Sequence, residues 1–150
     1  MAARRTSKAS AEAKRVRHLI ALDANNVMTR LAARHEAMVQ RFSRHRDRAA
    51  LVEPLSTWFS SITFGDLAAL ETREQRAISR FYESLDELRW YLSSTEDMPN
   101  QVTLTLSQSL RRLQSKYKEL TQFIGLPEAE GAPVVDAVVV GRRRQGRRPH

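Results

Sequence analysis

The sequence predicts an all-α protein, built as an elongated helical bundle of three long helices plus one short helix and followed by a disordered basic C-terminal tail. Three observations predict this fold. Apolar residues recur every three or four positions over several long stretches. The five glycines and five prolines of the 150 residues are grouped in a few places, which leaves these stretches uninterrupted. From residue 128 onward the composition changes to proline, glycine, valine and arginine.

The predicted organisation has three parts. They are a basic N-terminal arm at residues 1–9, a helical oligomerisation domain at residues 10–126, and a linker with an arginine-rich tail at residues 127–150. No apolar run approaches about 18 residues, so we expect no integral membrane association.

The formal net charge is +8, and its distribution is uneven. Residues 1–50 contain 12 Lys and Arg against 4 Asp and Glu, whereas residues 51–98 contain 4 against 9. The basic first part and the acidic middle could pair within one molecule or between copies. A basic surplus would remain, and it favours an anionic partner, most often nucleic acid.

The first long helix is expected to follow a loose arm at residues 1–9 and to run from about residue 10 toward Pro54. It should end near Ala50–Glu53, because the residue before a proline is disfavoured in helical conformation. Its apolar positions form an eleven-residue repeat, which keeps one apolar face on a nearly straight helix. They are Val16, Ile20, Ala24, Val27, Leu31, Met38 and Phe42, with His35 as the polar member of the series. A helix about 55 Å long needs other helices of this chain or a second copy to cover it, so we expect a homo-oligomer.

A basic stripe lies beside this apolar face. It consists of Arg30, Arg34, Arg41 and Arg48. Such a stripe is either a solvated flank or a face that contacts phosphates, and the spacing alone does not separate the two interpretations.

A short second helix is expected after Pro54, which suits a first helical turn. Its apolar face would be Leu55, Trp58, Phe59 and Ile62. We expect Gly65 to end it and Asp66 to cap the next helix.

The second long helix is expected from Leu67 to about Leu92, with a heptad pattern that is polar in its first half. Its aromatic residues suggest an interface. Trp90 and Tyr91 are neighbours and point about 100° apart, so a core cannot easily take both. We therefore expect one of them, together with Tyr82, to face a partner; the alternative is a half-exposed aromatic that covers a helix end. The predicted oligomer interface combines these residues with three of the first helix: His35, Met38, Phe42, Tyr82, Trp90 and Tyr91.

The last long helix is expected to follow a polar loop at residues 93–100. Its apolar face continues to Ile124, and Gly125 with Pro127 should end it. This helix and the one before it should form an antiparallel hairpin.

The tail contains two unusual segments. Val134–Val140 is rich in valine and too short to fold alone, so it could bind a protein partner or lie on a neighbouring subunit. Five arginines follow: Arg142, Arg143, Arg144, Arg147 and Arg148. Arginine can donate two parallel hydrogen bonds to a phosphate, so the tail is predicted to bind nucleic acid, with Arg30, Arg34 and Arg41 as a second candidate set. A nuclear-localisation patch, an anionic membrane surface and a solubilising tail are the alternatives.

No pattern typical of catalysis or metal binding occurs. There is no cysteine, no Glu-x-x-His, no pair of histidines four positions apart and no glycine-rich phosphate loop. We expect no enzymatic activity, no metal and no cofactor.

Two short segments resemble parts of hepadnavirus-type core proteins. They are Trp58-Phe59 with Thr63-Phe64-Gly65, and Val-Val-Val-Gly-Arg-Arg-Arg at residues 138–144. The resemblance implies an α-helical capsid subunit that dimerises through a helical hairpin and packages nucleic acid with its tail. The distance from Gly65 to the arginines is too long for a direct alignment, so we do not assign the chain to that family.

Two functions are therefore compatible with the sequence. The first is a non-enzymatic, self-assembling protein that binds nucleic acid through its tail, such as a nucleocapsid, capsid or nucleoid-type subunit. The second is a coiled-coil adaptor or scaffold for protein partners, whose tail is a localisation signal. For either function we expect a cytoplasmic or other intracellular location, with the nucleus and a virion as alternatives.

Overall fold

The computed structural model describes residues 2–127, and its regular structure is helical throughout that range. In chain order the elements are α1 (Ala2–His45), α2 (Ala49–Val52), a 3-10 turn (Glu53–Leu55), a second 3-10 turn (Phe59–Ser61), α3 (Phe64–Ala68), α4 (Thr72–Ser94) and α5 (Pro99–Ile124). The predicted all-α class is confirmed for this part of the chain. The predictions for Val134–Val140 and for the five tail arginines lie outside the described residues.

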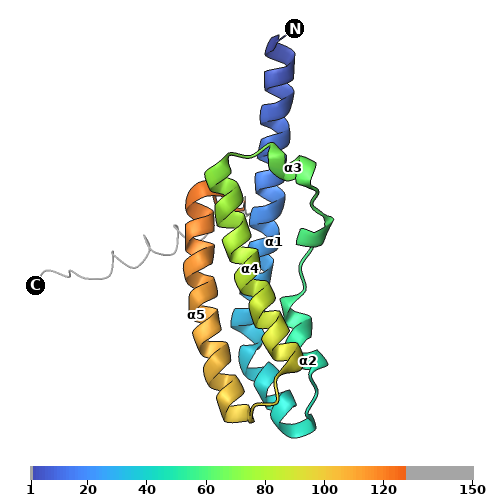
Figure 1. The fold of residues 1–150 in the computed structure, drawn as a ribbon, viewed down its shortest axis with the longest axis vertical. Coiled ribbons are helices and arrows are strands. Elements are labelled where there is room, and N and C mark those ends of the chain that lie inside the picture. Colours follow the sequence, from blue (N-terminus) through green and yellow to red (C-terminus); the bar gives the residue numbers. More distant parts are fainter. Residues whose placement is uncertain (1, 128–150) are drawn as a thin grey trace, which may run out of the picture.

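The three longest helices lie side by side, and the chain between α1 and α4 returns along the bundle as a series of short turns (Figure 1). The apolar repeat of α1 forms its share of the core, as its spacing predicts. Val16, Ile20, Ala24, Val27 and Leu31 are almost completely buried. Each fully buried side chain of this size contributes about 1.5–3 kcal/mol to folding, so this face holds α1 in the bundle.

Helix α1 differs from its predicted bounds at both ends. It begins at Ala2, so the arm expected to be loose at residues 1–9 is helical from residue 2. It ends at His45 rather than near Ala50–Glu53, because Arg46 adopts a left-handed conformation with φ of 53°. The carboxylate of Asp47 then accepts a hydrogen bond from the backbone N–H of Ala49 at 3.0 Å. This local cap starts α2 and ends α1 well before the proline takes effect.

The segment between α2 and α4 was predicted as one short helix ended by Gly65, and this prediction is wrong. Gly65 lies inside α3. Asp66 does not cap the next long helix; instead Asp66 and Thr63 form a capping box at the start of α3, with both N–H···O distances at 3.1 Å. Trp58, expected on an apolar face, is 72% exposed. Local capping by short polar side chains therefore divides this segment into separate turns.

Helices α4 and α5 form the hairpin core of the bundle. Helix α4 begins at Thr72 rather than at Leu67, behind a capping box formed by Glu71 and Glu74. Helix α5 begins with Pro99 in its first turn. The predicted end of α5 is confirmed: its C-cap residue Gly125 has a positive φ of 84°, a conformation that suits glycine.

A buried carboxylate joins the turns of the return segment to the long helices. Asp23 of α1 is 8% exposed. It accepts hydrogen bonds from the hydroxyl of Thr57, from the backbone N–H of Trp58 at 2.9 Å, and from the hydroxyl of Tyr82 at 2.6 Å. The ring of Phe59 stacks on that of Tyr82, with centroids 3.8 Å apart. Burial and the neighbouring carboxylate raise the pKa of Tyr82 far above its ordinary value, so its hydroxyl remains a donor.

Removing this carboxylate should destabilise the protein more than removing any one of its donors. Tyr82→Phe deletes one hydrogen bond to a charged group, for which we expect a loss of about 1.5–3 kcal/mol. Asp23→Ala leaves three donors without their acceptor, so it should lower the free energy of unfolding by more than Tyr82→Phe does. Urea unfolding of both variants measures the difference. Equal losses would show that Asp23 is not the shared anchor of this segment.

Candidate nucleic-acid interface

The start of α1 projects beyond the rest of the bundle (Figure 1). From residue 8 onward the first buried side chain of the helix is Ala13, and residues 8–12 before it are exposed. The sequence of residues 2–18 contains six Lys and Arg and one acid, Glu12. Extending a helix that packing has already nucleated costs little, so these turns can remain helical without neighbours.

Several basic side chains at this end are available for an external partner. Lys8, Lys14 and His18 are exposed, and within residues 8–127 neither lysine forms an ion pair with an acidic side chain. The side chain of Arg15 is 60% exposed and lies 3.7 Å from a carboxylate oxygen of Asp66. A long, exposed contact of this kind contributes little free energy, so Arg15 can exchange it for a phosphate.

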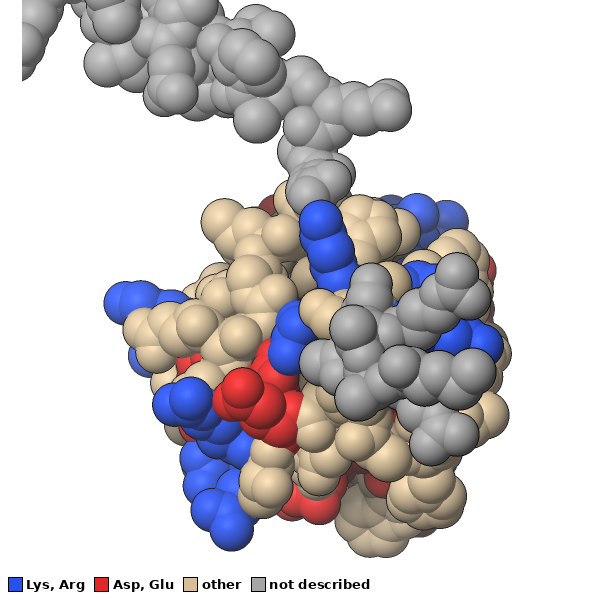
Figure 2. Space-filling model, turned by 90° about the horizontal axis from the view of Figure 1, so that it is seen from above, with Lys and Arg blue, Asp and Glu red and all other residues tan. Residues whose placement is uncertain are grey.

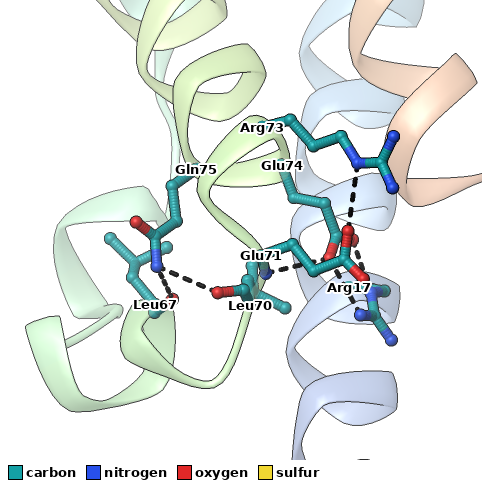
Figure 3. Close-up of polar contacts among 7 residues, drawn as sticks. All are labelled: Arg17, Leu67, Leu70, Glu71, Arg73, Glu74 and Gln75. Carbon is teal, nitrogen blue, oxygen red and sulfur yellow. Dashed lines mark hydrogen bonds and ion pairs between the residues drawn. The ribbon is translucent and has the colours of Figure 1, made fainter.

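Arg17 belongs to the same helix end but has a structural partner (Figure 3). Its guanidinium donates two hydrogen bonds to Glu74, from Nε to Oε2 at 2.5 Å and from Nη2 to Oε1 at 2.8 Å. Glu74 also accepts from the backbone N–H of Glu71 at 3.1 Å. The bond from Arg17 is the main reason why the pKa of Glu74 lies below its ordinary value. Arg17 therefore fixes the start of α4 to α1 and is excluded from the candidate interface.

The described chain ends beside the basic start of α1. Ile124 and Leu126 line a hollow of about 470 Å³ together with Ala11, Lys14 and His18 of α1. Seen from this end of the bundle, Lys and Arg side chains lie on several sides, with a smaller group of acidic side chains among them (Figure 2). The segment that carries the tail arginines therefore begins beside the basic face of α1, and the first of these arginines, Arg142, follows 15 residues after Pro127.

The predicted arginine stripe of α1 is not part of this end. Arg30 donates hydrogen bonds to the carbonyl oxygens of Pro54, at 3.3 Å, and Ser56. It thereby satisfies backbone groups of the return segment, and we remove it from the candidate interface. Arg34 and Arg41 are exposed. Because Arg34 lies 16 residues after His18, it is about 24 Å further along the helix than the hollow where the described chain ends.

Three residues predicted for an oligomer interface lie in the interior instead. Met38, Phe42 and Tyr82 are buried by the chain's own helices and turns. The apolar repeat predicted correctly that the first two are apolar contacts, but those contacts are made within the chain. Tyr82 is drawn inward because its hydroxyl has a buried acceptor in Asp23.

The other three predicted interface residues are at least partly accessible. His35 is half-buried, and its Nδ1 lies 3.1 Å from the carbonyl oxygen of Leu31 in the same helix. Tyr91 is half-buried and donates to Asp97 at 2.7 Å. Trp90 is 73% exposed. Of these three residues, Trp90 is the one whose apolar surface is largely free for a partner.

The described residues contain neither a membrane-spanning helix nor a cluster of metal ligands. None of their helices is both long enough and apolar enough to cross a membrane. Within residues 2–127, no group of three or more His, Asp or Glu side chains is arranged to hold a metal ion.

Sequence reasoning did not single out Lys14, Arg15 and His18 as a surface. Their spacing places them on one side of a helix, together with Ala11. This helical spacing indicates a binding surface only once Leu126, near the end of the described chain, is known to lie beside Lys14 and His18.

The pair between Arg17 and Glu74 should make stability depend on acid pH. Because the pKa of Glu74 is lower in the folded protein than in the unfolded chain, its contribution is complete above about pH 4.3, the ordinary glutamate value, and is lost as the pH falls through the folded pKa. Glu74→Gln should therefore unfold at lower urea concentration than the unmodified protein at about pH 7, with a smaller difference near pH 3. Glu87→Gln, on an exposed part of α4, is the control. A difference that does not change with pH would contradict this role of Glu74.

Comparisons with models of protein families, with curated proteins and with solved structures find no match to this chain.

Proposed function

We propose that the protein is a non-enzymatic, self-assembling helical protein that binds nucleic acid, in the manner of a nucleocapsid, capsid or nucleoid-type subunit. In this proposal the three long helices form one elongated bundle, and the binding surface combines the projecting start of α1 with the arginine-rich tail. One observation carries the proposal: Leu126, next to the end of the described chain, lines a hollow together with Lys14 and His18, so the sequence that leads to the arginine-rich tail begins beside the basic start of α1.

The physical basis is charge density. Duplex DNA carries one negative charge for about each 1.7 Å of its axis, and a protein that neutralises phosphates releases the condensed counterions. The projecting part of α1 is about 16 Å long and exposes Lys8, and Lys14 follows where α1 enters the bundle. Neither lysine has an acidic partner in the described part of the chain. Such contacts position the protein on the backbone and read no bases, so we expect little sequence preference.

The adaptor or scaffold function is the second candidate, and a different surface favours it. Three large apolar side chains are exposed near the return segment: Leu19, Trp58 and, at 94% exposure, Phe64. Leu19 and Trp58 line the same hollow, and exposed apolar side chains that lie together in this way typically mark a protein-binding surface. In this alternative the tail arginines would serve as a localisation signal.

Charge-neutral variants should locate the nucleic-acid surface. Changing the five tail arginines to glutamine, or Lys8 and Lys14 to glutamine, should weaken binding at every sequence tested. Each lost contact should lower the slope of log affinity against log salt by about 0.9 for duplex or about 0.7 for single strands. Fluorescence anisotropy with labelled oligonucleotides over a range of salt concentrations measures both quantities.

The matched control for the lysine pair is Arg34→Gln with Arg41→Gln, which removes two charges further along the same helix. A larger effect of this control than of the lysine pair would move the binding surface to the middle of α1. If the unmodified protein fails to bind at low salt, the nucleic-acid proposal is wrong and the adaptor proposal replaces it.

Self-association should involve Trp90, which lies near the end of the bundle opposite to the projecting part of α1 (Figure 1). Association there would leave the basic ends free. Sedimentation velocity at tens of micromolar protein should give a dimer or larger species for the unmodified protein and a smaller one for Trp90→Gln. Trp58→Gln removes the other exposed tryptophan and should leave the assembly unchanged. A strictly monomeric unmodified protein would refute self-association.

A further inference from the structure

A groove of about 510 Å³ lies between α4 and the return segment. Its lining includes the apolar side chains of Phe59, Ile78, Tyr82 and Leu85. Phe64, the most exposed large apolar side chain in the described residues, also borders it. Ile78, Tyr82 and Leu85 are themselves buried, so Phe59 and Phe64 supply most of the accessible apolar surface, which an apolar segment of chain would cover.

Acidic residues follow the α4 side of the groove. Glu83 and Asp86 line it, and Glu87 lies one position further along the helix. In the described part of the chain none of the three carboxylates belongs to an ion pair. Arg89 lines the groove as well and offsets part of this negative charge. The groove therefore suits a ligand that is apolar in one part and basic in the next.

We propose that the segment Val134–Val140 of the same chain docks in this groove, with Arg142 beside Asp86 and Glu87. The segment has the required order, because its valines are followed directly by Gly141 and the arginines. Docking does not depend on nucleic-acid binding and goes beyond the function proposed above.

The end of the described chain lies within reach of the groove. Gly125 borders a hollow together with Glu71 and Arg73 at the start of α4, and the groove begins within the next turn at Gln75. The chain would have to pass round α4, whose diameter with side chains is about 10–12 Å. Residues 127–133 can span at most about 23–25 Å, so their length is sufficient.

The dimensions and the alternation of side chains also agree. Helix α4 rises about 21 Å from Gln75 to Arg89, and seven extended residues cover about 23 Å. In an extended segment Val135, Ala137 and Val139 point to one side, and Asp136 points to the other. The fully apolar side can therefore face the groove while Asp136 remains in water. If Val134 lies at Thr72, where α4 begins, Arg142 arrives about 26 Å further along, level with Arg89 and within one turn of Asp86 and Glu87.

Tethering makes even a weak contact effective. A short flexible connection gives an effective concentration in the millimolar range, so a contact with a dissociation constant of about 1 mM would be formed about half of the time. Docked arginines would lie against carboxylates of the protein itself, and any external anion would have to compete with these carboxylates.

The chain has no cysteine, which allows a direct test by disulfide formation in the full-length protein freed of nucleic acid. One variant carries Ser79→Cys, on the exposed α4 side of the groove, with Ala137→Cys. The control carries Ser115→Cys on α5 with Ala137→Cys. Each serine is exposed and lies about 12–15 Å along its helix from the end near Gly125, so a freely moving tail would reach both.

Docking predicts at least about fivefold more intramolecular disulfide for the groove pair than for the control under mild oxidation, measured by non-reducing electrophoresis and mass spectrometry. Adding Val135→Asp and Val139→Asp should reduce the yield to that of the control, and these two changes lie outside the described core. Equal yields for both pairs would overturn the proposal. Disulfide-linked dimers as the main product would also overturn it, because the tail of a second copy would then occupy the groove.

Discussion

The path of the chain between α1 and α4 depends on the buried carboxylate of Asp23. The return segment has little regular structure, so its backbone N–H and C=O groups need partners from elsewhere. Polar side chains of α1 supply them in order along the helix: Arg30 binds two carbonyl oxygens near residue 55, and Asp23 binds the Thr57–Trp58 turn. Arg17 then holds the start of α4 through Glu74. Helix α1 therefore contributes an apolar face to the core and a polar edge that positions the rest of the chain.

Periodicity predicted those parts of the fold that depend on neighbours in sequence. The all-α class, the buried repeat of α1 and the end of α5 at Gly125 follow from spacing and from glycine conformation. The break in α1 depends on a cap by Asp47, which competes locally with a helix that the apolar pattern alone would continue. The return segment depends on partners far away in sequence: Asp23 and Tyr82, for example, are 59 positions apart. Spacing within one helix contains no information about such a pair.

The Asp23 carboxylate also explains why the burial of two aromatic residues, Tyr82 and Trp58, was predicted wrongly. Tyr82 was expected to face a partner, but its hydroxyl has an acceptor inside the protein, and burial of its ring costs no unsatisfied polar group. Trp58 was expected to be buried, but Asp23 binds its backbone N–H, and that contact leaves the indole ring outside. An aromatic residue is therefore placed by the partner available to its polar atom as much as by its position on an apolar face. Such partners also determine which exposed aromatic surface remains for other molecules.

The net charge indicates a binding surface only after the cations with partners inside the protein are separated from those without. Arg17 and Arg30 contribute to the formal charge of +8, yet both have partners within the protein that they would have to leave in order to bind a phosphate. If they left, the buried carboxylate of Glu74 and the carbonyl oxygen of buried Pro54 would each lose a hydrogen-bond donor, which costs more free energy than an exposed phosphate contact returns. Lys8 and Lys14 carry no such cost, because neither has an acidic partner in the described part of the chain. We therefore place the candidate interface at the start of α1, where the lysines are free, rather than at the arginine stripe in the middle of the helix.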